Sequence, residues 1–137
     1  MSLDDAEDRS DAITPFERVG GEPAVRGLVD RFYDLMDLDS DYAALRALHP
    51  THLDGSRDKL FWFLCGWLGG PPHYVERFGH PRLRARHMPF AIGVAERDQW
   101  LDCMKEAMTE LKMDAALADR LAASFFNTAD WMRNRGA

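Results

Sequence analysis

The chain has 137 residues, of which 46% are hydrophobic and 29% are charged, and its formal net charge is −6. This length fits a single domain, and the acidic balance argues against a general affinity for nucleic acid. No apolar run approaches the roughly 20 residues that span a bilayer, and the acidic N-terminus is unlike a secretory signal, so we expect a cytoplasmic protein that does not enter a membrane.

The N-terminal part of the chain contains a tail and a helix start. Residues 1–12 are rich in acidic side chains and have little to bury, so we expect a disordered acidic tail followed by one domain over residues 13–137. The sequence Thr14-Pro15-Phe16-Glu17 places proline directly after a capping residue and glutamate three positions after it, as at the start of many helices. The glycines at 20–21 are expected to end this short helix.

Apolar residues then recur at spacings of three and four, which predicts helices. The first covers residues 22–36. A shorter one covers 41–48 and ends at the His-Pro pair 49–50, because a residue before proline is disfavoured in the helical conformation. The strongly apolar residues 53–68 predict a helix buried on more than one face, and the Gly-Gly-Pro-Pro sequence at 69–72 ends it.

The C-terminal half is also predicted to be helical. A loop-like region with one short helical turn reaches His87, and two longer helices follow over 94–113 and 115–133. Strand patterns are absent, so we predict an all-α domain of about six helices. Cys65 and Cys103 lie inside apolar helical patterns and form no C-x-x-C pair, which indicates buried, unreactive thiols.

A short basic stretch stands out in this acidic chain. The sequence RLRARHMPF at 82–90 holds three arginines and a histidine. A flat, apolar, iron-containing macrocycle with two carboxylate arms would need one imidazole, arginines at its rim and a slot between aromatic helices. An alternative is a non-haem metal site made of His49, His52 and Asp54, although Pro50 interrupts the helix that usually presents such ligands. Conventional catalytic motifs are absent.

Several short motifs follow one another along residues 14–133: Gly20-Gly21, RFY at 31–33, Gly69-Gly70, GHPRLRARHMPF at 79–90 and ERDQWL at 96–101. In this order and spacing they resemble the truncated haemoglobins, and within that family the second group. The resemblance implies a globin-like two-over-two sandwich of four main helices around haem b.

The resemblance assigns the proximal side of this haem by position. His87 matches the ligand of the iron, which would bind through Nε2 while the other ring nitrogen is held by a backbone carbonyl. Arg86 matches a residue that pairs with a haem propionate, and Arg84 and Tyr74 are further candidates for that rim. The alternative for Arg84 is a solvated surface charge. The apolar residues expected to pack near the proximal side are Met88, Phe90 and Ile92.

The resemblance also assigns the distal side. Tyr33, His49 and Trp100 match the positions from which this group hydrogen-bonds the ligand, although Tyr33 and Trp100 would also fit as plain core aromatics. Ser56 lies where many globins have a distal histidine, and it is a weaker donor. The apolar ceiling of the pocket is expected to consist of Leu60, Phe61 and Leu64.

These assignments imply a protein that binds O₂, NO and CO at ferrous iron. Each charge-assisted donor would add roughly 1.5 to 3 kcal/mol to ligand retention, and a slow-releasing globin is a poor carrier. The hypothesis is therefore ligand chemistry: reaction of O₂ with NO to give nitrate, or peroxidase-like turnover of peroxide. The alternative is oxygen storage, transport or sensing without turnover.

Further expectations concern partners and the sixth iron position. Turnover needs a reductase that returns ferric haem to the ferrous state, and the acidic chain would suit a basic one. The protein is expected to be a monomer or a homodimer. Another alternative places His49 or His52 at the sixth position when no gas is bound. Without the resemblance, a helical module that binds a partner protein through its aromatic stripe would rank first, and such a module would be colourless.

Overall fold

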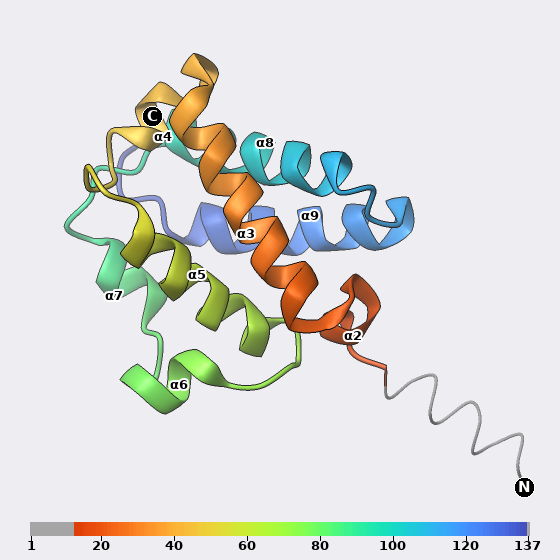
Figure 1. The fold of residues 1–137 in the computed structure, drawn as a ribbon. Helices are drawn as coiled ribbons and strands as arrows, with labels where there is room; N and C mark the ends of the chain where they lie inside the picture. The colour runs from red at the N-terminus through yellow and green to blue at the C-terminus, as the bar shows by residue number, and fades with distance from the viewer. Residues whose placement is uncertain (1–12, 137) are drawn as a thin grey trace, which may run out of the picture.

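The computed structural model describes residues 13–136, so the predicted acidic tail lies outside the described part of the chain. Within these residues the chain is all-helical, which confirms the predicted fold class, and it has no helix long and apolar enough to cross a membrane (Figure 1). The helices are α2 (Pro15–Val19), α3 (Gly21–Leu38), the 3-10 helix η1 (Ser40–Tyr42), α4 (Ala43–Arg46), α5 (Asp54–Trp67), α6 (His73–Phe78), α7 (Leu83–His87), α8 (Val94–Glu110) and α9 (Ala115–Trp131).

The start of α2 has the cap that the sequence predicts. The Thr14 hydroxyl accepts a hydrogen bond from the Glu17 amide at 3.1 Å, and the Glu17 carboxylate accepts one from the Thr14 amide at 3.3 Å. This reciprocal pair satisfies two backbone donors that have no partner within the helix. At the other end Gly20 has a φ of +116°, which lies in the left-handed region that glycine adopts without strain.

Four long helices make two packed pairs. Helix α3 packs against α5, α8 packs against α9, and α3 also packs against α8, which joins the pairs. Figure 1 shows α5 running alongside α3, with α8 and α9 behind them. This arrangement agrees with the predicted two-over-two sandwich. The residues of the core come mainly from the facing stripes of α3 and α8, namely Val25, Leu28, Val29, Phe32, Met36, Cys103, Met104, Ala107 and Met108.

The structure has more helices than the expected six, with eight α-helices and one 3-10 helix between residues 13 and 136. The predicted helix over 41–48 is divided into η1 and α4, and the region before α8 contains two short helices, α6 and α7. Pro72 directly precedes α6, and proline is compatible with a helix start because the first backbone N–H groups have no helical partner. Gly79, with a φ of +75°, ends α6.

Candidate functional site

His87 is the last residue of α7 and is half-buried. Its Nδ1 lies 2.6 Å from the carbonyl oxygen of Leu83. Because a carbonyl can only accept, Nδ1 carries the hydrogen of the neutral ring, and Nε2 is left with its lone pair. The imidazole is therefore oriented and in the tautomer required of a metal ligand that binds through Nε2.

Arg86 and Tyr74, which were both predicted for the propionate rim, lie near each other. The Arg86 guanidinium carbon is 5.9 Å from the centre of the Tyr74 ring, and Nε donates to the Pro81 carbonyl at 2.8 Å. The two terminal nitrogens of Arg86 have no hydrogen-bond partner among residues 13–136. An exposed guanidinium held by one nitrogen can still present the others to a carboxylate.

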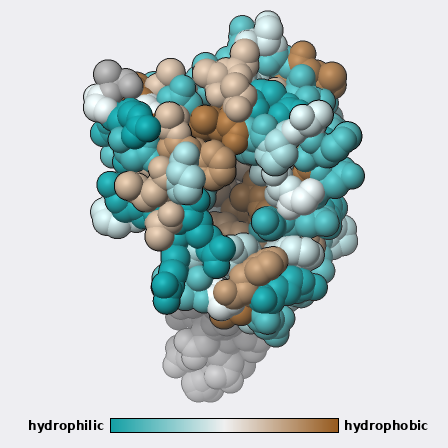
Figure 2. All heavy atoms as spheres, turned by 90° about the vertical axis from the view of Figure 1, so that its left-hand side faces the viewer, coloured by the Kyte–Doolittle hydropathy of each residue, from teal (hydrophilic) through white to brown (hydrophobic). Residues whose placement is uncertain are grey.

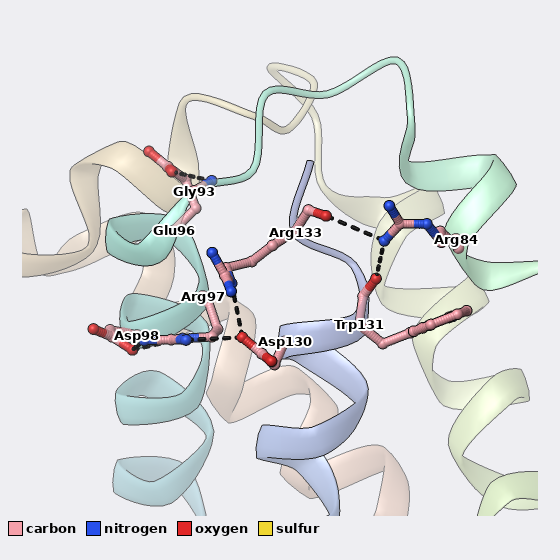
Figure 3. Close-up of polar contacts among 8 residues, drawn as sticks. All are labelled: Arg84, Gly93, Glu96, Arg97, Asp98, Asp130, Trp131 and Arg133. Carbon is pink, nitrogen blue, oxygen red and sulfur yellow. Dashed lines mark hydrogen bonds and ion pairs between the residues drawn. The ribbon is translucent and has the colours of Figure 1, made fainter. Parts of the chain in front are cut away.

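Arg84, the other arginine predicted for the rim, is engaged elsewhere. Its Nη1 donates to the carbonyl oxygens of Trp131 and Arg133 at the C-terminal end of α9 (Figure 3). The guanidinium also lies over the Trp131 ring, 5.2 Å from its centre. These contacts compete with any role of Arg84 at a propionate.

The three predicted distal residues are connected through one buried phenylalanine. Tyr33 on α3 contacts the ring of His49 with centroids 5.8 Å apart, and it contacts Phe32 at 5.0 Å. Phe32 in turn contacts Trp100 on α8 at 5.2 Å. Residues from α3, α8 and the connection after α4 are thus brought together, although they are far apart in the sequence.

The protonation states in this cluster follow from burial. Burial raises the pKa of the Tyr33 phenol, so its hydroxyl keeps its hydrogen at neutral pH and can donate. The indole N–H of Trp100 can only donate. Burial also lowers the pKa of His49, and this effect outweighs the hydrogen bond to the Leu45 carbonyl, which acts in the opposite direction, so this imidazole is neutral at pH 7.

The hydrogen bond of His49 decides what this ring can do. Its Nδ1 lies 3.0 Å from the Leu45 carbonyl oxygen, so the hydrogen of the neutral ring is on Nδ1. Nε2 then offers a lone pair, which can accept a hydrogen bond or bind a metal. In its neutral form His49 therefore does not supply the donor that its sequence position led us to expect.

The connection that carries His49 is held by Arg46. The Arg46 guanidinium donates to the carbonyls of Pro50 at 2.8 Å and Thr51 at 2.9 Å, and to the Asp37 carboxylate at 2.9 Å. His52, in the same connection, is exposed to solvent. Of the two histidines considered for the sixth position, only His49 contacts another distal residue, Tyr33.

Helix α5 carries four residues that were predicted to line the pocket, and three of them lie as expected. Ser56 and Leu60 are half-buried and Leu64 is buried. The ring of Phe61 instead lies beneath the Arg26 guanidinium, 4.3 Å from its carbon, and stacks on His73, so it packs between α3 and α6.

Two further α5 aromatics, Phe63 and Trp67, were not predicted for the site. Together with Tyr74 they line a cavity of about 240 Å³ between α5 and the α6 region. The Phe63 and Tyr74 rings meet edge to face, with centroids 6.2 Å apart. Residues 56, 60, 63 and 67 are spaced by four, three and four positions, so the sequence alone could have shown that they share one face of α5. A larger cavity of about 400 Å³ at the end of α3 contains none of the predicted site residues.

Two of the three apolar residues predicted for the proximal side are exposed. Met88 is 52% exposed and Phe90 is 43% exposed, whereas Ile92 is buried. Figure 2 shows a hollow with apolar atoms at its floor on the edge of the molecule where the α4–α5 and α7–α8 connections lie. An oriented imidazole, exposed apolar side chains beside it and an available guanidinium fit a flat apolar group with an anionic edge.

The alternative metal site has no structural support. No group of three or more histidine, cysteine, aspartate or glutamate residues in the described range is arranged to hold a metal ion, so the triad of His49, His52 and Asp54 is not formed. The thiols of Cys65 and Cys103 are buried, as predicted, and burial raises their pKa to about 11 and about 12.

Comparisons with known proteins give a consistent result. The family model of bacterial-like globins matches residues 14–134. The group 2 truncated haemoglobin of Bacillus subtilis is 38% identical over 121 residues, which cover 88% of this chain and 89% of that protein. The group II 2-on-2 haemoglobin of Agrobacterium tumefaciens superposes with a TM-score of 0.86 at 47% identity, over 89% of this chain and 95% of that one. The structure of a truncated oxygen-avid haemoglobin from Bacillus subtilis matches with a TM-score of 0.81 at 38% identity, over 88% and 99%. This chain therefore belongs to the bacterial-like globins, as a truncated haemoglobin of the second group with haem as its cofactor.

Proposed function

We propose that this globin retains O₂ tightly and supports redox chemistry at its iron, either reaction of bound O₂ with NO to give nitrate or, with peroxide in place of O₂, peroxidase-like turnover. The observation that carries the proposal is the cluster of Tyr33 and Trp100 around Phe32, with two side-chain donors that stay protonated at neutral pH. The similar protein from Bacillus subtilis that is described as oxygen-avid supports it.

In this proposal one group of residues binds the haem and a second group binds the ligand of its iron. Haem, when bound, would supply a ferrous iron that binds O₂, NO or CO. His87 would hold the iron through Nε2, and Arg86 with Tyr74 would hold the propionate edge. Tyr33 and Trp100 donate hydrogen bonds toward the ligand. Each bond is worth roughly 0.5 to 3 kcal/mol, depending on how much charge its acceptor carries.

Turnover requires a partner protein that supplies electrons. Formation of nitrate from NO and O₂ consumes one electron, so a reductase must return that electron before the next cycle. The net charge of −6 suits a reductase with a basic docking face. We also propose that the protein is cytoplasmic and acts as a monomer or a homodimer.

His49 has a distinct place in this proposal. Its Nε2 lone pair favours a role as hydrogen-bond acceptor within the distal cluster, or as a sixth ligand of iron when no gas is present. A low-spin ferrous spectrum in the absence of gas, converted to a five-coordinate spectrum by His49→Leu, supports ligation. A five-coordinate spectrum of the unmodified protein excludes it.

The first experiment is the visible spectrum of the purified protein in the ferric, dithionite-reduced and CO-bound forms. We expect an intense Soret band that shifts with CO, and its loss in His87→Ala. A spectrum unchanged in His87→Ala would overturn the assignment of the proximal ligand. A colourless protein that takes up no added haemin would favour the partner-binding alternative.

The proposed retention of O₂ is tested by its dissociation rate. We expect slow release in the unmodified protein and release about ten- to a hundredfold faster in Tyr33→Phe and Trp100→Phe, as the loss of roughly 1.4 to 2.8 kcal/mol predicts. Tyr42→Phe is the matched control, because the Tyr42 hydroxyl binds Glu106 at 2.6 Å and contacts none of the distal residues. Fast release that neither substitution changes would favour oxygen storage or transport.

A further inference from the structure

Asn134, just beyond the end of α9, is hydrogen-bonded to the connection between α7 and α8. Its Nδ2 donates to the carbonyl of Phe90 at 2.7 Å and to the carbonyl of His87 at 3.3 Å. Its Oδ1 accepts from the Ile92 amide at 2.9 Å, and its own backbone amide donates to the Ile92 carbonyl at 2.9 Å. One side chain thus holds three backbone groups of the connection, one of which belongs to His87.

Arg84 makes a second tie between the same two parts of the chain (Figure 3). Its Nη1 donates to the carbonyls of Trp131 and Arg133, and its guanidinium lies over the Trp131 ring. The last carbonyls of a helix have no partner within the helix, so a cation placed there satisfies them and interacts favourably with the helix dipole. The contacts of Arg84 therefore stabilise the C-terminal end of α9 as well as the position of α7.

The C-terminal segment is in turn anchored to α8. Asp130 accepts from Arg97 at 2.8 Å and from Arg133 at 2.7 Å, as Figure 3 shows. The hydrogen bonds from Arg133 and Arg97 lower the pKa of the Asp130 carboxyl, so it stays ionised near neutral pH. The segment that holds α7 is thus attached to the long helices of the core.

Helix α7 needs such ties. It has five residues, none of them buried, and an isolated helix of fewer than roughly 12 residues is marginal in water. Apolar burial within α7 therefore contributes little to fixing its position.

We propose that residues 131–135, together with Arg84 of α7, form a C-terminal clamp, and that Asn134 and Arg84 are positioning residues that set where the Nε2 atom of His87 lies. The inference rests on the role of His87 as the iron ligand in the proposed function. It extends that role to the last residues of the chain, which the resemblance did not connect with the haem.

The clamp itself is tested by amide hydrogen exchange in the haem-free protein. In Asn134→Ala we expect the amides of residues 83–92 to exchange about fivefold faster or more, as the loss of one net hydrogen bond predicts. In Asn134→Asp the Oδ1 acceptor for Ile92 remains, so this amide should keep more protection than in the alanine variant. Asn127→Ala is the matched control, because Asn127 is exposed on α9 and makes no side-chain hydrogen bond in the described part of the chain. Equal exchange in the Asn134→Ala and Asn127→Ala proteins would overturn the clamp.

Its effect on His87 is tested in the haem-loaded protein. We expect Asn134→Ala and Arg84→Ala to lose haem about fivefold faster or more and to shift the iron–histidine stretching frequency, with partial recovery in Arg84→Lys. Arg120→Ala, an exposed arginine on α9, should behave as the unmodified protein. An unchanged stretching frequency in both alanine variants would refute the positioning role. Retention of haem by His87→Ala would instead refute the proposed iron ligand and leave the exchange result intact.

Discussion

At the scale of single residues, backbone carbonyls decide the chemistry of two histidines. His49 and His87 each donate from Nδ1 to the carbonyl four residues earlier, so each neutral ring presents a lone pair on Nε2. Neither ring has a hydrogen bond to a carboxylate within residues 13–136. The tautomer is therefore set by helix-like local geometry.

The burial of His49 predicts a pH dependence of stability. Its pKa is lowered in the folded protein, so below pH 6.5 the unfolded chain binds a proton that the folded one does not. The free energy of unfolding is therefore not reduced by His49 above pH 6.5. It decreases as the pH falls from 6.5 toward the pKa that His49 has in the folded protein. Urea unfolding of the haem-free protein between about pH 5 and 8 measures this slope, which His49→Gln should reduce. His52→Gln, at an exposed histidine, should not, and an equal slope in the His49→Gln protein would contradict the assignment.

At the scale of elements, α2 is joined to the end of α5 by a close backbone contact. The Phe16 amide donates to the Leu68 carbonyl at 2.9 Å. Gly69 has a φ of +95°, and a Cβ on Gly70 would lie 2.5 to 2.7 Å from atoms of the Phe16 ring. The two glycines are thus required by the turn and by the approach of α2.

Alanine should lower the free energy of unfolding at Gly70 and raise it at Gly27, which lies inside α3. Gly70→Ala is expected to lower the free energy of unfolding by about 1 to 3 kcal/mol because of overpacking against Phe16. Gly27→Ala, at a helical position with no atom within 4 Å of the new Cβ, should raise it by roughly 0.5 to 1 kcal/mol. Urea unfolding of the two proteins measures both values. Equal stability of the Gly70→Ala protein and the unmodified one would show that Phe16 can move aside.

At the scale of the whole molecule, the predicted distal residues belong to the core or pack against it, whereas most of the predicted proximal residues do not. The core lies between the four long helices, while the predicted iron ligand His87 lies on the short helix α7 and the apolar residues predicted to pack near it lie in the connection to α8. A chain of rings passes from Tyr33 through Phe32, Trp100 and Phe125 to Trp67, with centroids 4.7 to 5.3 Å apart, and it runs within the core and the aromatic residues packed against it.

This division predicts that the haem-free protein folds and that haem stabilises it further. A ligand that binds only the folded state at a hundred times its Kd adds about 2.7 kcal/mol. We expect the Tm to rise on addition of haemin, and the rise to be much smaller in His87→Ala. Thermal unfolding followed by circular dichroism measures both. An equal rise in the two proteins would indicate haemin binding outside the proposed site.

The sequence by itself determined the family and the four long helices, in which apolar residues recur every three or four positions. The spacing of apolar residues located α3, α5, α8 and α9 to within a few residues, because each has one face that must be buried. The Thr14 cap predicted α2 for an equally local reason. The ordered motifs indicated the truncated haemoglobins and haem, and the comparisons confirmed both.

Only the tertiary structure decided the features that depend on distant partners. Helices α6 and α7 are too short to be stable without contacts, so local sequence indicated a single turn there. The contact between the rings of His49 and Tyr33 depends on the packing of α3 against α4. The guanidinium of Arg84 binds carbonyls 47 and 49 residues further along the chain, and such partners follow from the tertiary structure rather than from any spacing in the sequence.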